Sequence, residues 1–321
     1  MEVEARSDAE ELTHGAAAVS AETAAERTRE RAGVLFALAC AVNGAFVPAV
    51  AKITTAEAGG LAVALLTTAI AAAVAAGVLF ARHGWREWWA QERRVALLAL
   101  GVLGTGISFF LFFTGAKQAT AIETVLCLQI EPVYSLLLAW LVLGHRPTAQ
   151  RLAATAVIVL GIALALGVER LPESRGIWLL LLTPLCWQLS HLIVLRKLRG
   201  VQVEVLTAGR YIWGAAALLA FFLLQEERPQ LFASVPAHAW PWLALQGAVL
   251  SYGGTMVWYA AVRRIDLARA TVLVVPTVPL LSLVVSFALL REVPNVQQLA
   301  GVVLTAAGVY AFARRGVGQP A

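Results

Sequence analysis

The sequence predicts an all-α membrane protein with ten transmembrane helices, arranged as two inverted repeats of five helices each. Three observations predict this fold: the composition, the recurrence of apolar stretches long enough to cross a bilayer, and an internal repeat. Of the 321 residues, 60% are apolar and 14% are charged, whereas soluble domains have roughly 45–50% apolar and about 25% charged residues. So few charged residues cannot cover a soluble protein of this size, and lipid is therefore expected to be its main solvent.

The chain begins with a polar segment, residues 1–31, which contains eight of the 20 acidic residues and no aromatic residue. It lacks the apolar region that a signal peptide carries after a basic start. We interpret it as a disordered or loosely helical tail in the cytosol, and residues 314–321 as a second, short cytosolic tail.

From residue 32 onward, apolar stretches follow one another, each of about the 18–25 residues that a bilayer requires. Five of them make up the first predicted repeat, residues 32–168, and five make up the second, residues 176–313. The ten predicted spans are 32–52, 60–81, 95–116, 119–143, 149–168, 176–195, 204–224, 239–262, 267–290 and 296–313.

The basic residues are distributed unevenly between the two sides of the predicted membrane. Eighteen of the 25 lie in segments that are cytosolic if the N-terminus is cytosolic, six lie in outer loops, and Arg210 lies within a span. Because basic residues favour the cytosolic side, we expect a multi-pass protein of the plasma (bacterial inner) membrane with both termini in the cytosol. The net charge of +5 comes with no basic run or aromatic–basic groove, which excludes nucleic acid as a partner.

An internal repeat relates residues 101–164 to residues 248–311. At this spacing of 147 residues, Pro132 aligns with Pro279 and Gly161 with Gly308. An odd number of helices in each repeat means that the second copy enters the membrane in the opposite direction. Inverted repeats of this kind are typical of transporters, whose substrate site lies near the bilayer midplane between the repeats.

With these segments in hand, the chain resembles the EamA family of the drug/metabolite transporter superfamily. The family's repeat has a helix that carries Pro, then a leucine-rich run, a Gly-Glu pair and a final helix with a late Gly. The matching residues here are Pro132 with Gly144, Pro279 with Glu292, the pair Arg210-Tyr211, and Trp187. The resemblance covers residues 32–313 and implies a ten-helix carrier, commonly an exporter of amino acids, amines or other metabolites.

The sequence departs from the family pattern at several places. His145 stands where the first repeat usually has the glutamate, and Asn43-Gly44 stands where Trp-Gly is common. The second span also lacks a counterpart of Arg210. These departures leave the identity of the transported molecule open.

Glu131 is the first candidate for transport chemistry, because an ionisable group in a span costs roughly 2.5–3.5 kcal/mol unless it faces a cavity or a partner. It lies about midway along the fourth span, on a polar stripe that includes Tyr134. Pro132 lacks an amide donor and is expected to kink the helix there. Glu131 is therefore a protonatable site that binds a cationic group or couples transport to protons, or else it satisfies polar groups at the kink.

Arg210 and His191 are the other ionisable residues within the spans. Arg210 could pair with a substrate carboxylate or with Glu131, or its side chain could extend to the cytosolic headgroups. His191 could relay protons, because its unperturbed pKa is about 6.5, or could form a hydrogen bond between helices.

Several further polar residues recur at places that suit a central cavity. Asn43 and Gln188 occupy matching positions in the two halves, and Tyr252 and Tyr259 line one face of the eighth span. The candidate cavity residues are Glu131, Asn43, Tyr134, Trp187, Gln188, His191, Arg210, Tyr252 and Tyr259. The candidates for proton coupling are Glu131 and His191, and those for hinges are Pro132 and Pro279.

The sequence therefore predicts a secondary transporter that exports or exchanges a small metabolite by alternating access, driven by a proton gradient or by the substrate gradient. No Walker A motif is present to use ATP, and no His-Glu-x-x-His motif indicates an intramembrane metalloprotease. We expect no enzymatic activity, no cofactor and no metal, since Cys40, Cys127 and Cys186 lack the spacing of metal ligands. A flippase for lipids or other amphiphiles within the same fold is the alternative, and the sequence leaves the oligomeric state open.

Overall fold

The computed structural model describes residues 2–90, 93–144, 146–167, 174–225, 235–265 and 267–313. All secondary structure within these ranges is helical. The first half contains α1 (Glu2–Glu57), α2 (Gly60–Ala81), α3 (Trp85–Ala90), α4 (Arg94–Gly101), η1 (Val102–Ile107), α5 (Ser108–Gln118), α6 (Ala121–Leu128), α7 (Glu131–Leu143) and α8 (Ala149–Leu166). The second half contains α9 (Arg175–Lys197), α10 (Val203–Leu223), η3 (Ala237–Ala239), α11 (Trp240–Ala244), η4 (Leu245–Gly253), α12 (Gly254–Val262), α13 (Leu267–Val274), α14 (Thr277–Leu290) and α15 (Val296–Ala313).

Seven helical stretches in the described part of the chain are long and apolar enough to cross a membrane. They are Glu26–Glu57, Gly60–Ala81, Arg94–Gln118, Ala121–Val142, Ala149–Leu166, Arg175–Lys197 and Val203–Leu223. These stretches correspond to the first seven predicted spans. The predicted spans 239–262, 267–290 and 296–313 are also helical, but they are not among these seven stretches, so the number ten stays a prediction. The all-helical, multi-pass architecture is confirmed.

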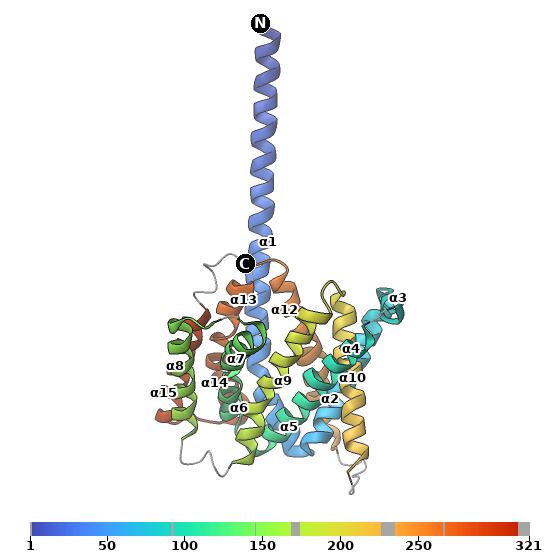
Figure 1. Cartoon of the computed structure of the whole chain (residues 1–321), viewed down its shortest axis with the longest axis vertical. Coiled ribbons are helices and arrows are strands. Elements are labelled where there is room, and N and C mark those ends of the chain that lie inside the picture. Colours follow the sequence, from blue (N-terminus) through green and yellow to red (C-terminus); the bar gives the residue numbers. More distant parts are fainter. Residues whose placement is uncertain are drawn as a thin grey trace.

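The first helix reaches far beyond the bundle. The half of α1 that includes the predicted tail, residues 2–31, projects from one end of the molecule, and the other half packs inside it (Figure 1). Contacts with the bundle begin near the predicted start of the first span, where Arg29 Nη2 donates to the Arg263 carbonyl at 2.9 Å and Glu30 pairs with Arg269. The second predicted tail, residues 314–321, lies outside the described residues.

The internal repeat is visible in the positions at which helices begin, break and end. Both α7 and α14 end at equivalent residues, Leu143 and Leu290, which are 147 positions apart. The residues that follow, Gly144 and Arg291, both have a left-handed backbone, with φ of 73° and 57°. Each half also contains a π-helical segment, η1 or η4, in the equivalent helix. The two halves therefore share local distortions as well as sequence.

The last helix of each half packs against its counterpart. At the left of Figure 1, α8 and α15 lie side by side, and small residues allow their backbones to approach closely. A Cβ atom on Gly161 would lie 2.6 Å from the Thr305 amide nitrogen, and one on Gly308 would lie 2.9 Å from the Ile158 amide nitrogen. Gly161 of α8 thus meets Thr305 of α15, and Ile158 of α8 meets Gly308 of α15. Because residue numbers fall along α8 as they rise along α15, the two helices run antiparallel.

The predicted break at Pro132 is present. In the fourth span, α6 ends at Leu128 and α7 begins at Glu131, and a hydrogen bond from the Val133 amide to the Ile130 carbonyl (2.9 Å) tightens the turn between them. The equivalent helix of the second half breaks between α13 and α14, just before the buried Pro279. Amides in the first turn of a helix have no acceptor within the helix, so a proline there removes no helical hydrogen bond and the fold accommodates both prolines.

Candidate functional site

The centre of the candidate site is a carboxylate at the break in the fourth span. Glu131 is the first residue of α7, and its Oε1 accepts a hydrogen bond of 2.6 Å from Gln188 Nε2 of α9. Among the residues that the structure describes, no donor bonds to its other carboxylate oxygen, Oε2. One oxygen is therefore held by the protein and the other is free to bind a ligand or a proton.

The face of α9 that carries Gln188 contributes two further candidates. His191 lies one turn beyond Gln188, on the same face of the helix, and its side chain is exposed. The indole Nε1 of Trp187 is buried without a hydrogen-bond partner in the described part of the chain. Buried donors are nearly always paired, so this one indicates a place for a ligand or a water molecule.

Arg210 of α10 is fixed to the π-helical segment η1. Its Nη2 donates to the Gly104 carbonyl at 2.9 Å, and its Nε donates to Thr105 Oγ1 at 3.2 Å. A π-helix interrupts the regular hydrogen-bond ladder of an α-helix, which leaves carbonyl groups for such side-chain donors. Arg210 thus bonds across the bundle and does not extend to the headgroups.

The same arginine connects the ionisable candidates. Gly104, whose carbonyl accepts from Arg210, packs against Ser190, the neighbour of His191 in α9, and Glu131 is within electrostatic range of the guanidinium charge. No direct ion pair joins Arg210 to Glu131 in the described residues, and Nη1 of Arg210 has no protein acceptor there. A cationic and an anionic group with unused bonding positions therefore lie near each other within the membrane-spanning region.

Tyr211 makes the corresponding contact with the second half. Its Oη donates to the Ser251 carbonyl of η4 at 2.8 Å and lies 2.9 Å from Thr255 Oγ1. Gly104 and Ser251 are 147 residues apart and hence equivalent in the repeat. Two adjacent residues of α10 thus hold equivalent carbonyl groups in the two π-helical segments.

Of the remaining candidates, Tyr134 lies one turn from Glu131 on α7, and the others contact different parts of the bundle. Asn43 donates from Nδ2 to the Leu250 carbonyl of η4 at 2.9 Å, so it forms a contact between helices. Tyr134 lies near Cys186, Tyr252 near the ion pair of Arg82 and Glu204, and Tyr259 near Tyr211. The structure thus brings together Glu131, Gln188, His191 and Arg210, whereas Asn43 bonds to η4, Tyr252 is part of η4 and Tyr259 follows in α12.

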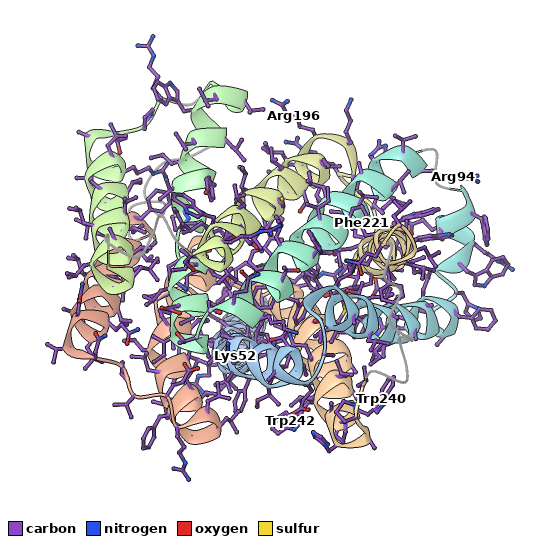
Figure 2. All side chains as sticks on the ribbon, turned by 90° about the horizontal axis from the view of Figure 1, so that it is seen from below. Lys52, Arg94, Arg196, Phe221, Trp240 and Trp242 are labelled. Atoms are coloured by element: carbon purple, nitrogen blue, oxygen red, sulfur yellow. The ribbon has the colours of Figure 1, made fainter. Side chains whose placement is uncertain are left out.

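Two charged residues that sequence reasoning left without a role stabilise helix ends. Lys52, labelled in Figure 2, donates from Nζ to the carbonyls of Ala119 and Lys117 at 2.6 and 3.1 Å, at the C-terminal end of α5. Glu292 accepts from the amides of Ala121 and Ile122 at 3.1 and 3.2 Å, at the N-terminus of α6. Each charge complements the helix dipole that it faces. Only the Gly-Glu pattern of the resembled family pointed to Glu292.

The described residues contain no group of three or more His, Cys, Asp or Glu side chains that could hold a metal ion. The groups that the candidate site offers for recognition are an anionic and a cationic side chain, an amide, an imidazole and an indole N–H.

Comparison with known proteins gives concordant results. The profile of the EamA-like transporter family matches the chain twice, over residues 31–167 and 174–314. Over 268 residues the chain is 31% identical to the probable terminal-alkyne amino-acid exporter of Streptantibioticus cattleyicolor, covering 81% of this chain and 85% of that protein. It is 24% identical over 246 residues to the uncharacterized transporter YyaM of Bacillus subtilis, covering 75% and 80% of the two chains. A solved crystal structure shares the fold with a TM-score of 0.63 at 20% identity and covers 89% of this chain and 99% of its own.

Proposed function

We propose, from the premise that this chain belongs to the EamA-like transporter family, that it is a secondary transporter which exports or exchanges an amino acid, an amine or a similar small metabolite. The observation that carries this proposal is the pairing of Glu131 with Gln188 close to the charge of Arg210. Ionisable groups in spans mark substrate or ion pathways. Here the two charges have opposite sign, and each keeps a bonding position that the described residues do not fill.

This arrangement favours a substrate with both an ammonium and a carboxylate group. The free oxygen of Glu131 suits an ammonium group, and Nη1 of Arg210 suits a carboxylate, for which the guanidinium geometry is well matched. The buried N–H of Trp187 offers one more donor. The name of the relative from Streptantibioticus cattleyicolor, an amino-acid exporter, agrees with this substrate class.

The transport cycle that we propose is alternating access between two inverted repeats of five helices, in a plasma membrane with both termini in the cytosol. Rocking of the repeats about a midplane site is the usual mechanism of such folds. The helix breaks before Pro132 and Pro279 occur at equivalent places and would serve as hinges. Protonation of Glu131 would release the ammonium group of the substrate, which links transport to protons, with His191 as a nearby relay.

Purified protein in liposomes tests the proposal. With a panel of amino acids and amines and an imposed pH gradient, we expect uptake of at least one zwitterionic substrate. Glu131→Gln should abolish the pH dependence and lower transport by about 10-fold or more, because a hydrogen bond to a charged group contributes about 1.5–3 kcal/mol.

Glu57→Gln is the matched control, because this carboxylate is exposed at the end of α1 and, among the described residues, pairs only with His238, at 3.3 Å. It should leave transport unchanged. If the Glu131→Gln protein folds and transports with unaltered pH dependence, proton coupling through Glu131 is wrong. If the panel gives no transport but a headgroup-labelled lipid is moved, the chain is a flippase instead.

A further inference from the structure

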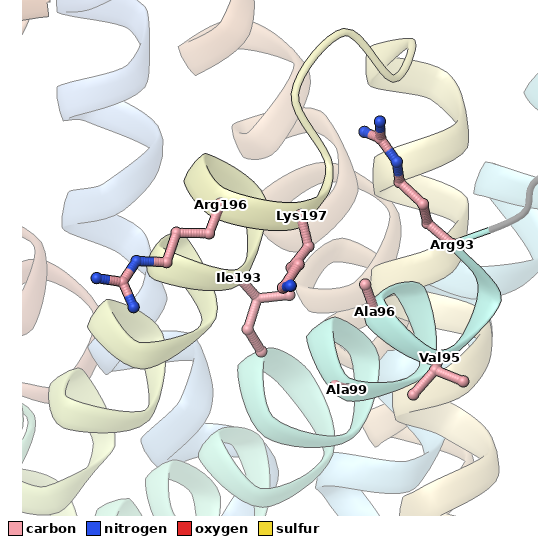
Figure 3. A pocket seen from close by; sticks show the side chains of 7 residues that line it. All are labelled: Arg93, Val95, Ala96, Ala99, Ile193, Arg196 and Lys197. Carbon is pink, nitrogen blue, oxygen red and sulfur yellow. The ribbon is translucent and has the colours of Figure 1, made fainter. Parts of the chain in front are cut away.

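A groove separates α4 from α9 at the cytosolic end predicted by the charge distribution. Toward the other end, the two helical stretches touch closely: a Cβ atom on Gly115 would lie 2.8 Å from the Gly176 carbonyl, and one on Gly104 would lie 2.7 Å from Ser190 Oγ. Toward the cytosolic end, an open groove with a volume of about 550 Å³ lies between α4 and α9. This volume is lined by Arg93, Val95, Ala96, Ala99, Ile193, Arg196 and Lys197 (Figure 3).

The lining combines an apolar floor with three cations. Four of the seven lining residues are aliphatic, three are basic, and none is acidic. Arg196 donates from Nη2 to the Val142 carbonyl at 2.6 Å, and Arg93 donates from Nη1 to the Arg199 carbonyl at 3.1 Å. Lys197 has no hydrogen-bond or ion-pair partner among the described residues, and in Figure 3 its amine lies between the other two cations. The groove therefore has a net positive charge and one ammonium group that is free to bind an anion.

The surroundings of the groove place it at the level of lipid headgroups. The short helix α3, which precedes α4 in the chain, presents exposed Trp85 and Trp89, and such aromatic residues gather at the membrane–water interface. Val95, on the groove wall, is 79% exposed. The apolar floor is thus continuous with a surface that faces lipid chains, whereas the cations lie at the ends of α4 and α9.

We propose that this groove binds an anionic phospholipid of the cytosolic leaflet. The phosphate would sit on Lys197 between Arg93 and Arg196, and an acyl chain would lie over Val95, Ala96, Ala99 and Ile193. Basic pockets between transmembrane helices on the cytosolic side suit anionic headgroups, with about 1 kcal/mol per basic residue near the surface. A soluble anion would gain the charge contacts but would leave the aliphatic floor uncovered.

The test uses the purified full chain in nanodiscs of phosphatidylcholine with or without phosphatidylglycerol. We expect phosphatidylglycerol to raise the unfolding temperature and to remain bound in native mass spectrometry. Lys197→Gln should weaken this retention by about 5-fold, since one charge contact of about 1 kcal/mol is lost. Ala99→Phe, which fills the floor without changing any charge, should weaken it as well.

Arg263→Gln is the matched control, because Arg263 is an exposed cation of the same predicted face outside the groove. Retention of phosphatidylglycerol in this variant should equal that of the wild type. Equal losses in Lys197→Gln and Arg263→Gln would show attraction by general charge and would overturn the proposal. Protection by inorganic phosphate equal to that by phosphatidylglycerol would also overturn it, because the occupant would then be a soluble anion.

Discussion

At the scale of single residues, the repeat places different side chains in the same backbone environment. Gly144 and Arg291 both follow the last turn of an equivalent helix with a left-handed φ, 73° and 57°. Glycine adopts this conformation without strain, whereas another residue pays roughly 1–2 kcal/mol. The second repeat thus carries a strained C-terminal cap that the first repeat avoids.

Arg291→Gly should stabilise the protein by about 0.5–1 kcal/mol. The relief of backbone strain is partly offset by loss of the contact between the Arg291 guanidinium and the Phe287 ring, 5.9 Å apart, which contributes about 0.5–1 kcal/mol at an exposed site. Thermal unfolding in one detergent measures the difference. Gly144→Ala is the matched change in the first repeat and should be destabilising; a lower unfolding temperature for Arg291→Gly would contradict the assignment of strain.

Glu131 and its hydrogen-bond partner show which features of the site a single sequence predicts and which it does not. Glu131 was identified from its position among apolar residues, because few other reasons place a carboxylate in a span. The sequence predicts Gln188 only as the counterpart of Asn43, whereas in the structure the two amides bond to different groups, the Glu131 carboxylate and the Leu250 carbonyl. Partners distant in sequence depend on helix packing, which a single sequence does not specify.

At the scale of elements, the lengths of the apolar stretches predict the helices. The amide hydrogen that Pro132 lacks predicts the break in the fourth span. The π-helical segments η1 and η4 had no such signal, since their residues are equally compatible with an α-helix. They matter because α10 bonds to both: Arg210 to Gly104, and Tyr211 to Ser251. Adjacent side chains thereby connect the distorted segments of both halves.

Tyr211→Phe should slow transport by roughly 2- to 10-fold, because it removes one hydrogen bond of about 0.5–1.5 kcal/mol from the η4 contact. The Ser251 carbonyl keeps its bond from Thr255 Oγ1 at 2.9 Å, so the protein should still fold. In the Arg210→Lys variant the positive charge is kept, but the single ammonium group cannot bond to both the Gly104 carbonyl and Thr105 Oγ1.

Transport rates of Tyr211→Phe, Arg210→Lys and the double variant form a cycle that measures coupling between the two contacts. If α10 moves both π-helical segments together, the effects should be non-additive by at least 0.5 kcal/mol. Strictly additive effects would show that the two contacts act independently.

At the scale of the whole molecule, the packing of α8 on α15 bears on how the repeats are oriented. Thr148 and Asn295 are equivalent residues, and each caps the helix that follows: Thr148 Oγ1 accepts from the Arg151 amide, and Asn295 Oδ1 accepts from the Gln298 amide. The two helices nevertheless run antiparallel. Equivalent helix starts therefore lie at opposite ends of the bundle, as an inverted repeat requires and a parallel repeat does not allow.

Equivalent positions should therefore be labelled from opposite sides of the membrane. Ala149 and Val296, the first residues of α8 and α15, are both exposed, and cysteines placed there leave the caps intact. In a variant with Cys40, Cys127 and Cys186 replaced by alanine, a membrane-impermeant maleimide should label Val296→Cys in intact cells. It should label Ala149→Cys only after permeabilisation, because the bias of basic residues assigns that end to the cytosol. Labelling of both from the same side would contradict the inverted arrangement, and the opposite order would reverse the orientation of the chain in the membrane.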